Sequence, residues 1–352
     1  MKRKLAILEN DIKYLSKLVK KFHEKYPDQF EVCAFTDHEI AFTALKRVKI
    51  DIFIADEAFY VDEGKIPEHC SFAYLVGMPD KKNFRGRKAI YKFQSIDFIY
   101  IQILNIYFEH LVKVPDAKSE NKRCKVISFT SISGGTGSST VAAACARNYA
   151  GKGRKVLYLN LESFGSADVF FDADGKANMS DVVHALRYEK NNLPRRLREC
   201  VQQDKSGVFF FSEPRTALDI AGLGSDERAL LLAELRLSED YEYIIVDLDF
   251  ELGPRFLEIC KQADAVIVVG DGTEISNRKI LKAESALFET GKLRMDVKER
   301  MFLVYNKFDS KLGGIIQESN MRAIGVIPRF ACVTMEQIPS KLSMMGVFEM
   351  VM

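Results

Sequence analysis

The chain has 352 residues, a length that favours two domains over one. With 47% hydrophobic and 28% charged residues, its composition is that of a globular protein with sizeable cores. The formal net charge is +2, and neither side of residue 120 has the excess of positive charge that predicts binding to nucleic acid. No apolar run reaches the ~18–20 residues that span a bilayer, and the start lacks a signal-peptide core. We therefore expect a cytoplasmic protein without direct membrane insertion.

Residues 1–114 alternate between short apolar runs and stretches with helical spacing. The predicted strands are residues 5–8, 30–35, 50–55, 72–76 and 89–91. The predicted helices are residues 12–22, 39–47 and 96–111. Five strands with intervening helices predict a parallel sheet with helices on both faces.

A polar and charged segment, residues 115–124, follows this first region and is predicted to be an interdomain linker. The alternation resumes over residues 125–352. The predicted strands there are residues 126–130, 156–161, 208–211, 243–247, 265–269 and 301–305, and the helices include residues 140–151 and 227–237. This pattern predicts a second doubly wound α/β domain, in which ligands bind beyond the carboxyl ends of the strands.

Residues 131–140 read Ser-Ile-Ser-Gly-Gly-Thr-Gly-Ser-Ser-Thr and lie between a predicted strand and an alanine-rich helix. Three glycines in four positions let successive backbone N–H groups turn toward an anion at the helix N-terminus. A merely tight turn is the alternative, but one glycine would satisfy it. The sequence therefore predicts a phosphate-binding loop, with the binding residues Gly134, Gly135, Thr136, Gly137, Ser138, Ser139 and Thr140.

This loop, with residues 156–162 (Val-Leu-Tyr-Leu-Asn-Leu-Glu) and 243–248 (Tyr-Ile-Ile-Val-Asp-Leu), resembles the ParA/MinD ATPases that have a deviant Walker A motif. The chain is more similar to their CpaE/TadZ branch, and within it to TadZ, over essentially its whole length. The resemblance implies an α/β fold of two doubly wound parallel-sheet domains, a receiver-like domain at 1–114 and a P-loop ParA/MinD-like domain at 125–352. It also implies a homodimer that binds ATP and Mg²⁺ and positions the Tad (Flp) pilus secretion machinery at the cell pole or a membrane complex.

Two departures from the family pattern concern the loop lysines. Ser133 stands in place of the signature lysine and Ser138 in place of the ordinary P-loop lysine. Because phosphoryl transfer depends on such cations, we expect weak or absent ATP hydrolysis. The rival interpretation is a cycling ATPase in which Lys152, Arg154 or Arg329 supplies the missing charge.

The resemblance assigns the magnesium ion to Ser139 and Asp247, with Asp249 as a nearby competitor. A strand-end aspartate that caps the next turn is the alternative for Asp247. Glu162 is a candidate for orienting an attacking water, or else a solvated loop carboxylate. Asn160 stands where the family has an acid, and an amide cannot accept the proton.

Asn306 ends a strand at the position where the family pairs an amide with adenine, and Pro328 falls in the segment near the base. The text Asn306-Lys-Phe-Asp309 also spells the guanine-reading motif of small GTPases. Those enzymes carry a loop lysine and an Asp-x-x-Gly switch. This chain has Ser138 at the lysine position, and residues 247–253 do not contain the switch motif. We therefore expect adenine.

In the first domain, Asp56 falls at the phosphoacceptor position of a receiver, Glu9 in the acidic pair and Lys92 at the lysine position. Val76 and Gly77 replace the switch hydroxyl. We expect a degenerate receiver used for partner binding, with a phosphorylation-dependent regulator as the alternative. The methionine-rich segment 338–352 has one lysine, which favours packing or partner contact over membrane binding.

Overall fold

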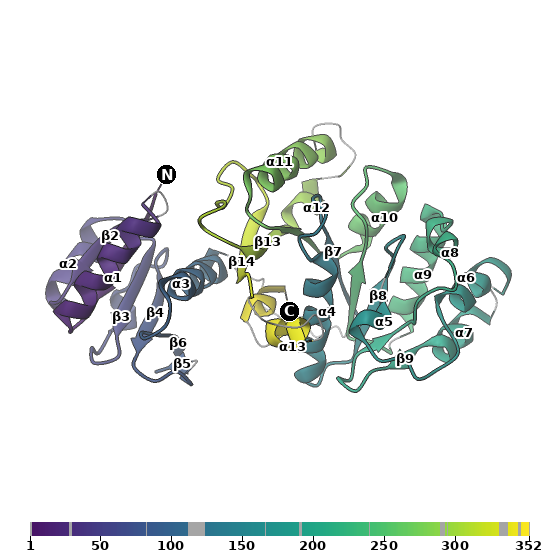
Figure 1. The fold of residues 1–352 in the computed structure, drawn as a ribbon, viewed down its shortest axis with the longest axis horizontal. Coiled ribbons are helices and arrows are strands. Elements are labelled where there is room, and N and C mark those ends of the chain that lie inside the picture. Colours follow the sequence, from purple (N-terminus) through teal and green to yellow (C-terminus); the bar gives the residue numbers. More distant parts are fainter. Residues whose placement is uncertain are drawn as a thin grey trace. The chain divides into compact units, whose positions relative to one another are not determined.

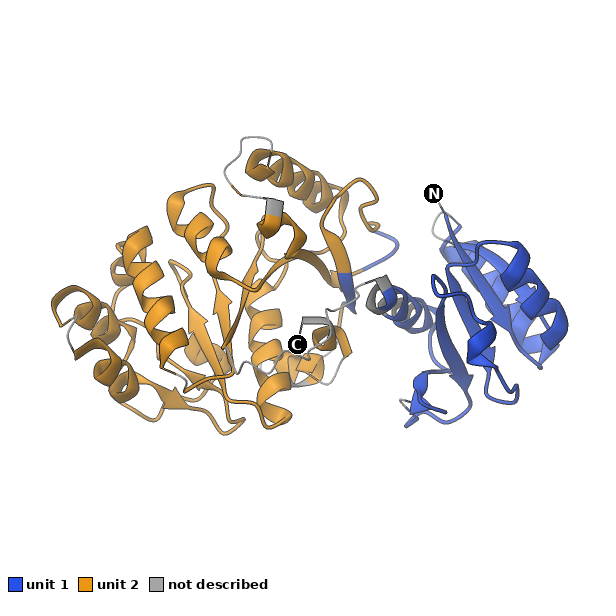
Figure 2. Cartoon of the chain, turned by 180° about the vertical axis from the view of Figure 1, so that it is seen from behind, with its two compact units in different colours: residues 1–113, 309–312, 324–328 blue, residues 114–308, 313–323, 329–352 orange. Residues whose placement is uncertain are grey.

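The computed structural model describes residues 2–27, 30–81, 83–111, 124–165, 167–189, 192–238, 240–288, 293, 295–330, 337–343 and 346–351. These residues form two compact units (Figure 2). The first unit holds residues 1–113, 309–312 and 324–328, and the second holds the remaining residues. The predicted linker lies outside the described residues, apart from Cys124.

The first unit is built on a six-stranded sheet with the order β2-β1-β3-β4-β6-β5 (Figure 1). All strands are parallel except β5, which pairs antiparallel with β6. The strands are β1 (Arg3–Leu8), β2 (Phe30–Phe35), β3 (Ile52–Asp56), β4 (Ser71–Val76), β5 (Asn83–Phe84) and β6 (Arg87–Tyr91). The helices are α1 (Ile12–Lys25), α2 (His38–Arg47), η1 (Glu63–Lys65) and α3 (Ile96–Leu111).

Alternating side chains bury both faces of this sheet. Ala6 and Leu8 of β1 share a core with Phe42 of α2. Because successive residues of a strand point to opposite faces, the intervening β1 side chains point to the other face, which α1 and α3 cover. There Tyr26 and Tyr100 stack with ring centroids 3.8 Å apart. This confirms the predicted parallel sheet with helices on both faces.

The described residues of the two connections that flank β4 form no α-helix. The sequence predicts no helix for residues 57–70, which hold only the short η1 and contain Gly64 and Pro67, both poor residues for a helix interior. After β4 the chain forms the β5–β6 hairpin. Its turn residues Arg85 and Gly86 have φ of 48° and 79°, the pair of left-handed residues that a two-residue hairpin favours.

The second sheet has eight strands in the order β14-β13-β12-β7-β11-β8-β10-β9, and its strands lie in the second unit apart from residues 324–328 of β14. The central pairs are parallel, and β9 is antiparallel to β10. The strands are β7 (Lys125–Thr130), β8 (Val156–Asn160), β9 (Gln202–Gln203), β10 (Phe209–Phe210), β11 (Tyr243–Asp247), β12 (Ala265–Gly270), β13 (Met301–Phe308) and β14 (Arg322–Pro328).

The helices of this unit cover the sheet, as Figure 1 shows. They are α4 (Ser138–Gly151), α5 (Ala167–Phe170), α6 (Met179–Tyr188), α7 (Leu193–Cys200), α8 (Ala217–Ala221), α9 (Ser225–Leu237), α10 (Pro254–Gln262), α11 (Glu274–Phe288), α12 (Met295–Glu299), α13 (Gln337–Ser343) and η3 (Gly346–Val351). α4 packs on β7, β8 and β11, while α13 packs on α4.

The strand order fixes where a ligand can bind. β7 lies between β12 on one side and β11 on the other. The chain runs from β7 to β8 on the β11 side, and later from β11 past β7 to β12, so successive connections run in opposite directions. In an open parallel sheet such a reversal opens a crevice at the carboxyl ends of the strands. The loop after β7 and the ends of β11 and β8 therefore meet at this edge.

The C-terminal segment packs inside the second unit. Leu342 and Phe348 are buried, and the Tyr149 hydroxyl of α4 donates to the Phe348 carbonyl at 3.1 Å. The Asn148 amide donates to the Ser343 carbonyl. Apolar side chains in the described part of this segment thus contribute to the core beside α4.

Candidate functional site

The predicted phosphate-binding loop joins β7 to α4. Gly135 and Gly137 have φ of 79° and 84°, values that L side chains rarely adopt. Gly137 is the N-cap residue of α4, so the loop leads directly into the positive end of the helix dipole. A Cβ atom at Gly137 would lie 2.7 Å from Nδ2 of Asn306, so the loop requires glycine there on two grounds.

Hydroxyl groups hold the first half of the loop in shape. The Ser131 hydroxyl donates to the Ser133 carbonyl at 2.6 Å and accepts from the Thr136 hydroxyl at 2.7 Å. The Ser133 amide donates to the same Ser131 oxygen at 3.2 Å. Thr136 is 1% exposed and Ser131 is half-buried, so this small network is partly shielded from solvent. Sequence reasoning did not single out Ser131.

The two serines that replace lysine lie inside the loop. Ser133 and Ser138 are both buried, and neither hydroxyl has a hydrogen-bond partner in the part of the chain that the structure describes. Leaving a buried donor unpaired costs about 1–3 kcal/mol. Such groups fit an anionic ligand that accepts hydrogen bonds, which is the chemistry of a phosphate.

A carboxylate cluster lies beside the first turn of α4. The Ser139 hydroxyl donates to Oε2 of Glu162 at 3.0 Å, and the Tyr158 hydroxyl donates to Oδ2 of Asp247 at 2.7 Å. Asp247 is fully buried, and its Oδ1 atom has no partner among the described residues. Carboxylate and hydroxyl oxygens are the ligands that Mg²⁺ prefers, so Ser139 and Asp247 fit that ion.

Burial shifts the acidity of both carboxyl groups. It raises the pKa of Asp247 well above its usual range, and the nearby charge of Glu162 adds to this effect. Burial also raises the pKa of Glu162, partly offset by the Ser139 hydrogen bond. Two carboxylates in one buried site disfavour each other's ionised form. A bound cation would favour the ionised pair.

Asn160 has a structural role in the turn after β8. Its Oδ1 atom accepts from the Glu162 amide at 2.9 Å, and a Cβ atom at Gly165 would lie 2.3 Å from the same oxygen. Asn160 therefore sets the backbone path that carries Glu162. Sequence reasoning missed Tyr158, because an aromatic residue inside an apolar strand gives no sign of a carboxylate partner.

Asn306 and Lys307 lie against the phosphate-binding loop. Asn306 is 4% exposed, and its amide nitrogen donates to the Thr136 carbonyl at 2.7 Å. The Lys307 ammonium donates to the Gly135 carbonyl, also at 2.7 Å. Adenine recognition by Asn306 stays a prediction. Nothing in the sequence indicated that Lys307, the second residue of the Asn-Lys-Phe-Asp motif, contacts the loop.

The structure separates two of the suggested substitute cations from the loop. Lys152 follows the last residue of α4, and Arg154 pairs with Glu242 at 3.0 Å. α4 has 14 residues. Since an α-helix rises 1.5 Å per residue, its two ends lie about 20 Å apart. Arg329 is exposed just after β14, and Pro328 is the buried last residue of that strand.

In the first unit, the predicted receiver residues form one buried cluster. Asp56 at the end of β3 and Glu9 just after β1 are 4% and 1% exposed. The Lys92 ammonium contacts Asp56 and lies 2.8 Å from a Glu9 oxygen. The backbone N–H groups of Ala58 and Asp11 donate to the same two carboxylates. The cluster is thus an ion-paired network at the carboxyl edge of the sheet.

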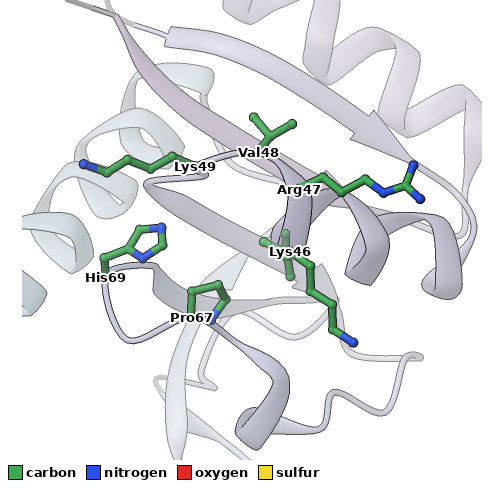
Figure 3. Close-up of a pocket in the computed structure, with 7 residues that line it drawn as sticks. Lys46, Arg47, Val48, Lys49, Pro67 and His69 are labelled. Atoms are coloured by element: carbon green, nitrogen blue, oxygen red, sulfur yellow. The ribbon is translucent and has the colours of Figure 1, made fainter.

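A concave basic surface lies at the opposite edge of this sheet (Figure 3). It is formed by the C-terminal end of α2 and the turn before β4. Its labelled lining residues are Lys46, Arg47, Val48, Lys49, Pro67 and His69. Because these residues precede β3 and β4 rather than follow them, this surface is separate from the Asp56 cluster.

Comparisons with solved structures find ParA- and MinD-type proteins. The ParA family ATPase from Chlorobium tepidum is 20% identical, covering 65% of this chain and 92% of its own, with a TM-score of 0.49. MinD in the MinC:MinD complex of Aquifex aeolicus is 19% identical, covering 62% and 86%, with a TM-score of 0.49. MinD from Pyrococcus horikoshii complexed with Mg-ADP is 18% identical, covering 59% and 82%, with a TM-score of 0.46.

No curated protein sequence matches the chain. Among the described residues, no helix is long and apolar enough to cross a membrane. Residues 1–108 match the family model "TadZ-like, receiver domain". This match confirms the predicted resemblance to the TadZ branch, and the chain therefore carries a TadZ-like receiver domain at its amino-terminal end.

Proposed function

We propose that the second unit binds ATP together with Mg²⁺. The observation that carries this proposal is the loop after β7, in which two left-handed glycines turn the backbone at the N-terminus of α4. The amide N–H groups of Gly135, Thr136 and Gly137 donate no hydrogen bond within the described residues. Backbone donors of this kind at a helix N-terminus suit a phosphate group.

The neighbouring carboxylates support the proposed binding of Mg²⁺. Ser139 and Asp247 would hold the ion, which neutralises phosphate charge when bound. Glu162 accepts a hydrogen bond from Ser139, so it lies in reach of the same region and is our candidate for orienting a water. The unpaired Oδ1 atom of Asp247 gives the ion a ligand that no other described group uses.

We expect hydrolysis to be slow or absent. The loop has no lysine, and removing comparable cations from phosphoryl-transfer sites costs about 10³–10⁵ in rate. Ground-state binding depends more on the backbone cradle, so it suffers less. Turnover on the order of 1 s⁻¹ or above would instead support the cycling ATPase.

The TadZ-like receiver domain supports a proposal for the cellular role. We propose a cytoplasmic homodimer that helps to position the Tad (Flp) pilus secretion machinery at the pole or at a membrane complex. The family match at residues 1–108 supports this assignment. The acidic cluster of that domain supports partner binding, because Lys92 already forms ion pairs with Asp56 and Glu9.

Isothermal titration calorimetry with ATP and Mg²⁺ tests the proposal. We expect binding by the full-length protein, lost or strongly weakened in Ser139→Ala and Asp247→Ala. Ser285→Ala, on the fourth turn of α11, is the matched control and should bind like the wild type. Absence of heat with millimolar nucleotide would overturn the proposal.

A phosphorylation-dependent regulator remains the second candidate, because Asp56 lies at a strand end beside Glu9 and Lys92. Incubation with Mg²⁺ and acetyl phosphate, followed by mass spectrometry, distinguishes the two. We expect no stable adduct, since Asn10 replaces one carboxylate of the acidic pair and so weakens the binding of Mg²⁺. A stable phosphoryl adduct on Asp56 would establish the regulator.

A further inference from the structure

We propose that Asn306 and Lys307 are positioning residues that clamp the phosphate-binding loop from outside and fix the direction of its N–H groups. The predicted effect on phosphate affinity rests on the proposed nucleotide binding. The predicted effect on the orientation of the loop peptides can be tested in the ligand-free protein. The clamp is defined as the two side-chain donors of Asn306 and Lys307 on the carbonyls of Thr136 and Gly135.

The two clamped carbonyls belong to consecutive peptide units. Both donor–acceptor distances are 2.7 Å. In a trans peptide unit the carbonyl and the next N–H point in opposite directions. A donor that holds the Gly135 carbonyl therefore turns the Thr136 N–H to the far side, and one that holds the Thr136 carbonyl does the same for Gly137. These N–H groups are two of the loop's unpaired donors.

Unusual backbone conformations on both sides of the contact support this role. Lys307 has φ of 54°, a left-handed value that is uncommon for a residue with a side chain. Strain of this kind persists where the surrounding structure imposes it, as at ligand sites. On the loop side, only the missing Cβ of Gly137 lets Nδ2 of Asn306 come so close. The loop and the clamp are therefore closely packed where Gly137 faces the Asn306 amide.

The clamp offers this loop a substitute for internal cations. Ser133 and Ser138 bring no charge, so phosphate affinity depends on how well the backbone donors are preorganised. The donors of the clamp act on the carbonyl side of the loop. They therefore strengthen phosphate binding through the backbone.

Calorimetry on the full-length protein with two probes, Mg·ATP and Mg·tripolyphosphate, separates the clamp from base recognition. Lys307→Met and Asn306→Ala should each weaken both probes by the same factor, about three- to tenfold. Lys307→Arg should recover most of the affinity, because it restores a donor. Lys279→Met, which removes an exposed lysine of α11, is the matched control and should bind like the wild type. Loss of ATP affinity alone in Asn306→Ala would show base reading and overturn the clamp.

Nuclear magnetic resonance of protein labelled with ¹⁵N-glycine and ¹⁵N-threonine tests the clamp without a ligand. We expect single amide signals for Thr136 and Gly137 in the wild type and in Lys307→Arg. In Lys307→Met and Asn306→Ala these signals should broaden or double, because the two peptide units can then reorient. Unchanged signals in both variants would overturn the clamp. If the wild type binds neither probe, the nucleotide proposal is overturned. The amide signals of the ligand-free protein would still show whether the clamp orients the loop.

Discussion

Among the described carboxyl groups, Asp247 is the one whose environment most opposes its usual charge state. It is fully buried, one oxygen accepts from Tyr158, and the other has no partner among the described groups. The folded protein thus keeps a group that is useful only when something binds to it. Sites of this kind trade stability for function.

We predict that Asp247→Asn stabilises the ligand-free protein at neutral pH. Burial raises the folded pKa of Asp247 above its unfolded value, so the folded state binds the proton more tightly. The stability that protonation contributes is complete below the unfolded pKa, about 3.9, and is lost as pH rises through the folded value. An amide avoids that loss and still accepts from Tyr158. We expect a gain of about 1–3 kcal/mol at pH 8.

Urea unfolding at pH 8 and pH 4.5, in the presence of a chelator, measures this effect. The gain should shrink at pH 4.5, where the wild-type carboxyl carries its proton for more of the time. Glu162→Gln should show a smaller gain of the same sign, because burial also raises the pKa of Glu162. An Asp247→Asn protein less stable than the wild type at pH 8 would contradict the prediction.

At the residue scale, the sequence indicated the groups that belong to a motif but not their tertiary partners. Ser139, Glu162 and Asp247 could be named from the resemblance to the family's motifs, and the structure places Ser139 against Glu162. Tyr158 and Lys307 could not be named. Their partners lie 89 and 172 residues away in the chain, so only folding brings them together.

At the element scale, the β7–loop–α4 junction depends on its three glycines to different degrees. Gly134 has no atom within 4 Å of an added Cβ and no left-handed φ. Gly135 has the left-handed φ but open space, whereas Gly137 has both the left-handed φ and the close Asn306 amide. Alanine at these positions therefore separates backbone strain from steric conflict.

We predict a graded loss of thermal stability in the ligand-free protein. Gly134→Ala should be nearly neutral, Gly135→Ala should cost about 1 kcal/mol from strain, and Gly137→Ala should cost about 2–3 kcal/mol from strain and overlap. Calorimetric unfolding measures all three. Adding Asn306→Ala should relieve part of the Gly137→Ala effect. Equal losses at Gly134 and Gly137 would refute the analysis of this junction.

Secondary structure followed from local patterns wherever a buried strand or an amphipathic helix had a clear period. The predicted helix at residues 96–111 agrees with α3, and the strand at 243–247 agrees with β11. The β5–β6 hairpin was missed, because β5 is only two residues long and polar segments of this size carry no period.

At the scale of the whole molecule, the fold class was predictable because long parallel sheets leave nearly continuous apolar runs in the sequence. Strands such as β12, with all six residues buried, have no polar alternation that could mislead. The strand order was not readable in this way. It determines which strand ends meet, and so it determines that β7, β11 and β8 together form the candidate site.

The final prediction links nucleotide binding to association. A ligand at about 100 times its Kd adds about 2.7 kcal/mol to the stability of the state that binds it. For a unit of this size, that raises Tm by roughly 5–10 °C. If the ligand also favours a homodimer, the Tm measured with Mg·ATP must rise further with protein concentration, since dilution shifts the equilibrium toward monomers.

Calorimetric scans over a hundredfold range of protein concentration, with and without Mg·ATP, measure both effects. Ser139→Ala, which weakens the proposed metal site, should show neither. A nucleotide-induced shift that does not depend on protein concentration would leave ATP binding in place and exclude nucleotide-driven dimerisation.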